Sequence, residues 1–133
     1  MSTSLEFQTA YKEGLMEART VDHRPWGYFE VLSPLVGVAH QIKRLHVNPG
    51  ARLSLQSHRR RSEVWCVVQG EATAELDGRP RTLRYGELLV IPVGAKHRLS
   101  NRGDITLIVV EIQLGEAFEE EDIVRYEDDY SRA

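Results

Sequence analysis

The strongest constraint on the fold is a succession of short, β-type segments that alternate with turn sequences between residues 28 and 113. Asp77-Gly78 suits a two-residue hairpin turn, and 48–50 and 101–104 mark further breaks. Short strands at this spacing favour an all-β fold, either a sandwich or a double-sheet jelly roll. The expected strands are 28–32, 38–47, 52–57, 63–68, 72–76, 81–83, 87–91, 97–100 and 106–113.

The β-rich region has a different kind of segment on each side. Residues 1–21 contain few β-branched side chains and are predicted to form a short N-terminal helix or arm, which leaves 22–115 for a β-barrel. Residues 116–133 are acidic but carry apolar anchors such as Phe118 and Ile123, which a plain solvated tail would lack. We expect this segment to pack on the barrel; a disordered tail is the alternative.

Composition indicates one globular domain of 133 residues. A formal net charge of −3 gives no general reason to expect nucleic acid or a membrane as partner. No apolar run is long enough to span a bilayer and no signal peptide is evident, so we expect a cytoplasmic protein. The single cysteine, Cys66, excludes an internal disulfide and lies in an apolar run, which favours a buried structural thiol over a nucleophile.

Two glycine-framed clusters, 50–70 and 86–101, supply four candidate metal ligands. Gln56 and His58 are two apart, so on a strand they leave the same face. The polar residues 59–62 suit a hairpin, after which Glu63 would open the returning strand opposite His58. His97 follows a second turn, and two stacked hairpins would bring it onto the other three.

The donor set formed by these four residues suits one divalent metal ion. Two imidazoles, a carboxylate and an amide fit zinc, manganese, cobalt, nickel or iron better than calcium or copper(I), and zinc is the first choice. The alternative is that each residue is an ordinary polar side chain near a turn. The occurrence of all four at framed spacings favours the metal site.

The two clusters resemble the paired motifs of the cupin superfamily, with Gln56 in place of the first histidine of the usual His-x-His. The run 49–58 resembles the type II mannose-6-phosphate isomerases, and more narrowly the isomerase domain at the C-terminus of bifunctional mannose-1-phosphate guanylyltransferases. Further matches are Arg24-Pro25-Trp26-Gly27 and residues 91–99, 111–115 and 121–130. The resemblance spans residues 22–132 and implies a cupin jelly roll, that is, a double-stranded β-helix.

Three positions depart from the family pattern. Arg59, Arg60 and Val64 stand where the family usually has histidines. If Glu63 points inward, Val64 points to the opposite face and does not affect the metal. Arg59 and Arg60 lie near the expected mouth of the site, where they would alter the choice of substrate.

The resemblance implies a metal-dependent aldose–ketose isomerisation of mannose 6-phosphate and fructose 6-phosphate through an enediol or enediolate. The metal would polarise the substrate oxygens, and neutral Gln56 would leave it more electrophilic than a second carboxylate would. The catalytic candidates are Glu111 and His46, either of which could be the general base, and Arg98. A structural salt bridge or an exposed side chain is the alternative for Glu111 and His46.

A sugar phosphate is the expected ligand, and phosphate needs fixed positive donors. Arg98 and Arg60 are the preferred ones. The further substrate-binding candidates are Arg52, Ser54 and Lys96. A solvated basic turn is the alternative for Arg59 and Arg61.

Two other functions stay open. One is a non-catalytic cupin that binds a sugar phosphate or a nucleotide sugar, as a sensor or as the partner of a separate guanylyltransferase. The other is an iron-dependent cupin oxygenase, which Gln56 disfavours because such enzymes use histidine and carboxylate ligands. A homodimer is expected, because exposed sheet edges invite pairing.

Overall fold

The computed structural model describes residues 20–32, 39–115 and 122–129. Every regular element within these ranges is a β-strand, which confirms the all-β prediction. Residues 1–19 of the predicted N-terminal helix or arm (1–21) and residues 116–121 and 130–133 of the acidic segment lie outside the described residues, whereas residues 20 and 21 belong to a strand. The strands are β1 (Thr20–Arg24), β2 (Gly27–Val31), β3 (His40–Val47), β4 (Leu55–Ser57), β5 (Arg61–Gln69), β6 (Ala72–Leu76), β7 (Arg79–Leu83), β8 (Leu88–Ile91), β9 (His97–Ser100), β10 (Leu107–Gly115) and β11 (Val124–Glu127).

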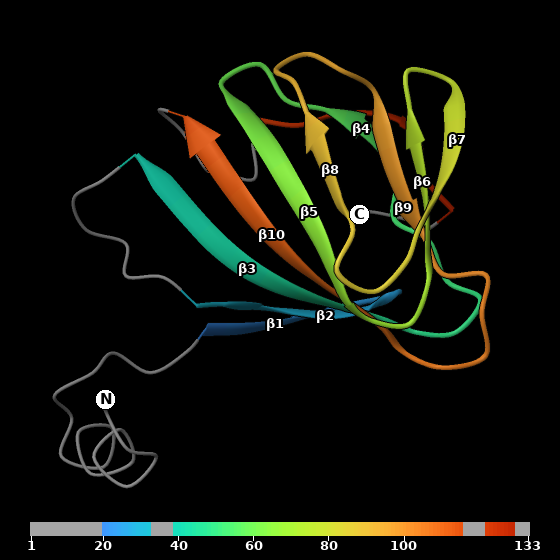
Figure 1. The fold of residues 1–133 in the computed structure, drawn as a ribbon. Helices are drawn as coiled ribbons and strands as arrows, with labels where there is room; N and C mark the ends of the chain where they lie inside the picture. Colours follow the sequence, from blue (N-terminus) through green and yellow to red (C-terminus); the bar gives the residue numbers. More distant parts are fainter. Residues whose placement is uncertain (1–19, 33–38, 116–121, 130–133) are drawn as a thin grey trace, which may run out of the picture.

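The strands form two antiparallel sheets that enclose one interior (Figure 1). One sheet has six strands in the order β1-β2-β3-β10-β5-β8, and the other has five in the order β11-β4-β9-β6-β7. This arrangement is the predicted double-sheet jelly roll. No helix long and apolar enough to cross a membrane occurs in the described part of the chain.

Strict alternation of burial along the long strands creates the core. In β3 every second residue from Gln41 to Val47 is buried, and in β5 the buried positions are Arg61, Glu63, Trp65 and Val67. This period of two is the signature of a sheet with one buried face. Large apolar side chains such as Trp65, which is 1 % exposed, fill the interior.

The register of the six-stranded sheet sorts polar and apolar side chains into rows across its inner face. Glu63 is level with Gln113 on β10, and Gln113 is level with Gln41 on β3. The next row holds Trp65, Glu111 and Lys43. A polar end of the barrel therefore adjoins an apolar one, and the polar end is where chemistry is possible.

Two of the strands lie outside the expected set. β1 begins at Thr20 and pairs with β2, with Arg24 opposite Gly27. β11 pairs with β4, so the described part of the acidic segment forms an edge strand of the five-stranded sheet. Both are short, polar edge strands, which carry little of the apolar alternation that identifies a buried strand.

The two expected hairpins are absent from the described residues, and that prediction is wrong. β4 belongs to the five-stranded sheet, whereas β5 pairs with β8 and β10 in the six-stranded sheet. The chain likewise leaves one sheet and enters the other between β8 and β9. Polar connecting residues indicate a turn, but they do not determine which sheet receives the next strand. His58 and Glu63 therefore approach each other across the interior, from opposite sheets.

The contact of Gly27 with β3 gives a test of this packing. A Cβ atom at Gly27 would lie 1.9 Å from the carbonyl oxygen of His46, at a φ of +150°. We expect Gly27→Ala to lower the free energy of unfolding by about 2 kcal/mol or more, measured by denaturant titration. Gly103→Ala is the control, because its nearest neighbour would be 3.4 Å away and its φ is ordinary. Equal stability of the two variants would contradict this close approach.

Candidate metal centre

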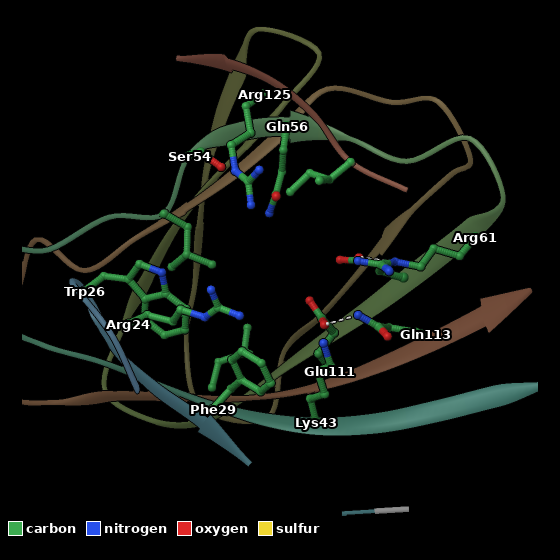
Figure 2. Close-up of a pocket in the computed structure, with 14 residues that line it drawn as sticks. Arg24, Trp26, Phe29, Lys43, Ser54, Gln56, Arg61, Glu111, Gln113 and Arg125 are labelled. Carbon is green, nitrogen blue, oxygen red and sulfur yellow. Dashed lines mark hydrogen bonds and ion pairs between the residues drawn. The ribbon is translucent and has the colours of Figure 1, made fainter. Parts of the chain in front are cut away.

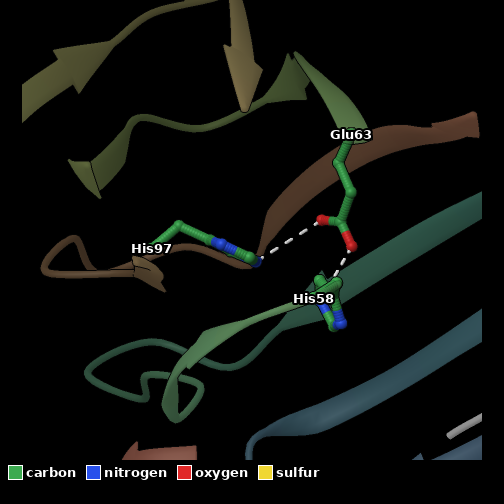
Figure 3. A group of neighbouring side chains, drawn as sticks. All are labelled: His58, Glu63 and His97. Carbon is green, nitrogen blue, oxygen red and sulfur yellow. Dashed lines mark ion pairs between the residues drawn. The ribbon is translucent and has the colours of Figure 1, made fainter. Parts of the chain in front are cut away.

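His58, Glu63 and His97 converge inside the barrel (Figure 3). His58 follows β4, Glu63 lies on β5 and His97 begins β9. One potential ligand atom from each lies within 4.8 Å of the other two. His58 Nε2 is 3.0 Å from Glu63 Oε1, and His97 Nε2 is 3.7 Å from Glu63 Oε2. All three residues are at most 2 % exposed, so the cluster is shielded from bulk water.

Both imidazoles are held by the nitrogen that faces away from the cluster. His58 Nδ1 donates to the carbonyl oxygen of Asp122 at 2.5 Å, and His97 Nδ1 donates to that of Ala95 at 3.0 Å. With the proton on Nδ1, the lone pair of each Nε2 is directed at the centre. A carbonyl acceptor behind a histidine is the usual partner of a metal-binding imidazole, because it fixes both ring orientation and tautomer.

The unsatisfied atoms of the cluster fit a metal ion. Glu63 Oε2 and His97 Nε2 are buried and have no hydrogen-bond partner among the described residues. Buried polar atoms without partners are uncommon because desolvation is costly, and a cation between these two would satisfy both. Two nitrogens and a carboxylate oxygen are donors that zinc and its neighbours accept.

The protonation states agree with ligand roles. Burial opposes ionisation of Glu63, but its polar contacts with His58, His97 and Glu111 outweigh burial and lower the pKa of this carboxyl. Burial lowers the pKa of His97. A carboxylate and a neutral imidazole are the forms that bind metals.

Gln56, the fourth predicted ligand, lies level with His97 across the pair formed by β4 and β9. Directly opposed residues share one face of a sheet, so Gln56 points to the same interior as His97. Its side chain lines the pocket that reaches Glu63. The structure thus places all four predicted ligands around one part of the interior.

This pocket contains Glu63 of the cluster and extends to Arg24 and Arg125, which lie on edge strands of the two sheets (Figure 2). Its charged and polar lining is contributed by strands of both sheets and by the segments next to them. The lining residues are Arg24, Trp26, Phe29, Lys43, Leu45, Leu53, Ser54, Gln56, Arg61, Glu63, Glu111, Gln113, Ile123 and Arg125.

Glu111 is a buried carboxyl in the wall of this pocket. It accepts hydrogen bonds from Trp65 Nε1 at 2.9 Å and from Gln113 Nε2 at 2.8 Å, and it shares a hydrogen bond with Glu63. Burial and the negative charge of Glu63 raise the pKa of Glu111 to about 8. The pair therefore holds one proton at neutral pH, with Glu63 ionised and Glu111 protonated.

Arg61 was not singled out from the sequence, yet it is part of the cluster. Its Nε donates to Glu63 Oε1 at 3.2 Å and its Nη2 lies 3.3 Å from His58 Nε2. The residue is 7 % exposed and its Nη1 has no partner among the described residues. Strand parity could have identified it, because Arg61 is two residues before Glu63 and so shares its inward face.

Several predicted catalytic and substrate-binding residues are not brought into the pocket. His46 lies on the outer face of β3, where its Nε2 is 2.7 Å from Glu30 and its ring stacks on Tyr28. Arg98 also points away from the cluster, because it follows inward-facing His97 on β9; it donates to Leu53 and Glu127.

Of the remaining predicted substrate-binding residues, one lies in the pocket and three lie outside it. Ser54 lines the pocket and is 3 % exposed. Arg52 pairs with Asp129 at the surface, and the Lys96 ammonium lies 4.3 Å from the centre of the Tyr126 ring. Arg60 is exposed, and its backbone N–H donates to the Asp122 carboxylate. The cations that line the pocket in their place are Arg24, Lys43 and Arg125, together with Arg61.

Metal content tests the cluster. We expect His97→Ala and Gln56→Ala each to lose stoichiometric divalent metal on dialysis, because each removes a ligand. His40→Ala, on the outer face of β3, is the matched control and should keep it. Elemental analysis by mass spectrometry gives the metal content, and circular dichroism verifies the fold. Full metal occupancy in a folded His97→Ala protein would eliminate this site.

Comparison with known proteins agrees with this architecture. The family model described as mannose-6-phosphate isomerase C-terminal matches residues 12–128. Staphylococcus aureus CapF, a capsular polysaccharide assembling protein, superposes with a TM-score of 0.69 at 21% identity, covering 84% of this chain and 35% of CapF. A cupin 2 conserved barrel domain protein from Salinispora arenicola gives a TM-score of 0.64 at 22% identity, covering 74% and 88%. These two likenesses show the fold.

Curated relatives are closer in sequence. Mannose-1-phosphate guanylyltransferase ManC of Salmonella typhimurium is 42% identical over 110 residues, which are 83% of this chain and 22% of ManC. The alginate biosynthesis protein AlgA of Pseudomonas aeruginosa gives the same identity and coverage. The chain thus spans less than a quarter of the length of these relatives. It belongs to the mannose-6-phosphate isomerase C-terminal family, built on a cupin jelly roll.

Proposed function

We propose that the protein is a metal-dependent isomerase that interconverts mannose 6-phosphate and fructose 6-phosphate. The observation that carries the proposal is that one pocket is lined both by Glu63, which forms a cluster with His58 and His97, and by the buried carboxyl of Glu111. An aldose–ketose isomerisation needs both components: a cation that stabilises developing charge on oxygen and a group that moves a proton between adjacent carbons. Membership of the family supports the same reaction.

Gln56, His58, Glu63 and His97 would hold the metal, for which zinc is our first choice and manganese, cobalt, nickel or iron are alternatives. When bound, the ion supplies Lewis-acid polarisation of the substrate's carbonyl and hydroxyl oxygens. Glu63 serves as a ligand. A single-chain structure does not test the predicted homodimer, which stays a prediction.

Glu111 is the proposed proton carrier. A cation on Glu63 would offset the charge that helps to raise the pKa of Glu111, and Glu111 would then lose its proton to solvent. As a carboxylate it takes the proton from C2 of the open-chain aldose, the C2–H electron pair forms the C1–C2 double bond, and the C1 carbonyl oxygen gains a proton from solvent to give the enediol. Return of the proton from Glu111 to C1, with loss of the O2 proton to solvent, gives the ketose. Trp65 and Gln113 orient the carboxyl through hydrogen bonds at 2.9 and 2.8 Å. Lys43 and Arg61 line the same space and stabilise the negative charge that develops on the substrate oxygens.

A binding protein without turnover is the second candidate, and one contact favours it. Arg61 Nη2 lies 3.3 Å from His58 Nε2, which is the atom that a metal would use. A guanidinium that kept this position would bind an anion in the pocket but would compete with the cation.

Reconstitution with metals distinguishes these candidates. We expect metal-free protein reloaded with zinc, manganese, cobalt, nickel or iron to convert mannose 6-phosphate into fructose 6-phosphate with at least one of these ions. A coupled assay for fructose 6-phosphate measures the product. Tight binding of mannose 6-phosphate with no turnover in any metal form would contradict the isomerase and support the binding protein. Oxygen uptake confined to the iron form would indicate an oxygenase instead.

Replacement of the proton carrier is the second test. We expect Glu111→Gln to lower kcat by about 10²-fold or more, because the amide keeps the shape but cannot move the proton. Exchange of the C2 hydrogen of the substrate with deuterated solvent, followed by NMR, should fall in parallel, while metal content is retained.

Two further variants complete that experiment. Glu71→Gln makes the same chemical change on an exposed side chain, and we expect full activity. His46→Ala should also keep kcat within about twofold, because this residue lies outside the pocket. A large loss of activity in His46→Ala, together with an active Glu111→Gln variant, would contradict Glu111 as the general base.

A further inference from the structure

The pocket is cationic although the protein is acidic. Four of its lining residues are basic, namely Arg24, Lys43, Arg61 and Arg125, whereas only Glu63 and Glu111 are acidic. The whole chain has a formal net charge of −3. Positive side chains concentrated in the hollow of an acidic protein create a local potential that attracts anions. The ligand of this pocket is therefore expected to carry negative charge.

The four cations fall into two groups. Arg61 is held in the metal cluster by Glu63, at 3.2 Å, and Lys43 lies level with Glu111 on the neighbouring strand. Arg24 and Arg125 instead lie on the edge strands β1 and β11, one from each sheet. Figure 2 shows both guanidinium groups directed into the pocket from opposite walls.

Strand register places this second pair on the outer side of the candidate ligands. Arg125 is level with Gln56, which is level with His97, so Arg125 adjoins one candidate ligand and is two strand intervals from His97. With strands about 4.8 Å apart, the Cα atoms of Arg125 and His97 are about 10 Å apart. Arg24 is four strands removed from the Glu63 strand in the order β1-β2-β3-β10-β5. The pocket thus extends from Glu63, past Gln56, to the two arginines.

Local contacts orient Arg24. Its Nη2 donates to Asp22 at 2.8 Å, and its guanidinium carbon lies 5.4 Å from the centre of the Phe29 ring. A guanidinium has five N–H donors in a planar fork, a geometry that matches phosphate oxygens. The Ser54 hydroxyl lines the same pocket beside the strand of Gln56.

We propose that Arg24 and Arg125 form the phosphate-binding site of the pocket, and that they bind a sugar phosphate with its carbonyl end at the metal cluster. This assignment rests on the proposed function for the identity of the sugar phosphate. The reacting carbons and the phosphate lie at opposite ends of such a molecule, which matches a pocket with two chemically distinct ends. The exposed pair Arg52–Asp129 and the pair of buried Arg98 with Glu127 instead attach the C-terminal segment to the barrel.

Binding of a ligand that cannot isomerise provides the test. Mannitol 6-phosphate has the phosphate but no carbonyl group, and mannitol lacks the phosphate; both are titrated calorimetrically into the metal-loaded protein. We expect Arg24→Gln and Arg125→Gln each to lower the affinity for mannitol 6-phosphate by about tenfold or more and to leave the affinity for mannitol unchanged. Inorganic phosphate should lose affinity in both variants.

The matched control is Arg81→Gln, which removes the same charge from an exposed position on β7. It should change the affinity for mannitol 6-phosphate by less than about twofold. Arg125→Lys keeps the charge but not the planar fork, and we expect an intermediate loss in a chain whose fold is verified by circular dichroism. Unchanged affinity in both Arg→Gln variants, or no preference of the unmodified protein for mannitol 6-phosphate over mannitol, overturns the proposal.

The titrations measure binding and need no turnover, so they test the phosphate site independently of the proposed isomerase activity. If the unmodified protein shows no turnover but both Arg→Gln variants bind mannitol 6-phosphate more weakly, the phosphate site is supported as part of a binding protein. In an active enzyme, the same variants should raise KM for mannose 6-phosphate more than they lower kcat, since binding remote from the reacting carbons is lost. A selective fall in kcat with unchanged KM would contradict a role in phosphate binding.

Discussion

Glu63 is a carboxylate buried at the centre of the barrel, and its surroundings are organised by the need to stabilise that charge. An ionised group taken out of water is costly unless it is paired and hydrogen-bonded. His58, His97 and Arg61 approach it from different elements, and Glu111 shares a proton with it. The two rows with polar residues on the inner face of the six-stranded sheet continue this network, whereas the next row, Leu45, Val109 and Val67, is apolar.

The C-terminal segment is part of that organisation although it is remote in sequence. The backbone carbonyl of Asp122 orients His58, and the carboxylate of the same residue accepts the backbone N–H groups of Arg59 and Arg60. Ile123 lines the pocket, and so does Arg125 on β11. The short segment 122–127 thus supports His58, forms part of the pocket wall and supplies one of its cations.

Local sequence predicted much of this structure because strands and turns are local features. β6 and β9 have the expected bounds, and the period of two places Gln56 and His97 inward. The same period, applied from His97, would have placed Arg98 outward. The sheet to which each strand belongs depends on long-range contacts. The polar residues between β4 and β5 therefore could not reveal that these strands lie in different sheets. Arg24 and Arg125 reach the pocket through edge pairings that composition does not reveal.

The crossing of the chain between the sheets has a thermodynamic consequence. The candidate ligands come from both sheets. An ion bound to them would cross-link the two sheets, which otherwise contact each other through apolar packing. Ligands that bind only the folded state add their binding free energy to its stability. The free energy of unfolding would then depend on the concentration of the metal ion, and a chelator would destabilise the barrel as well as empty the site.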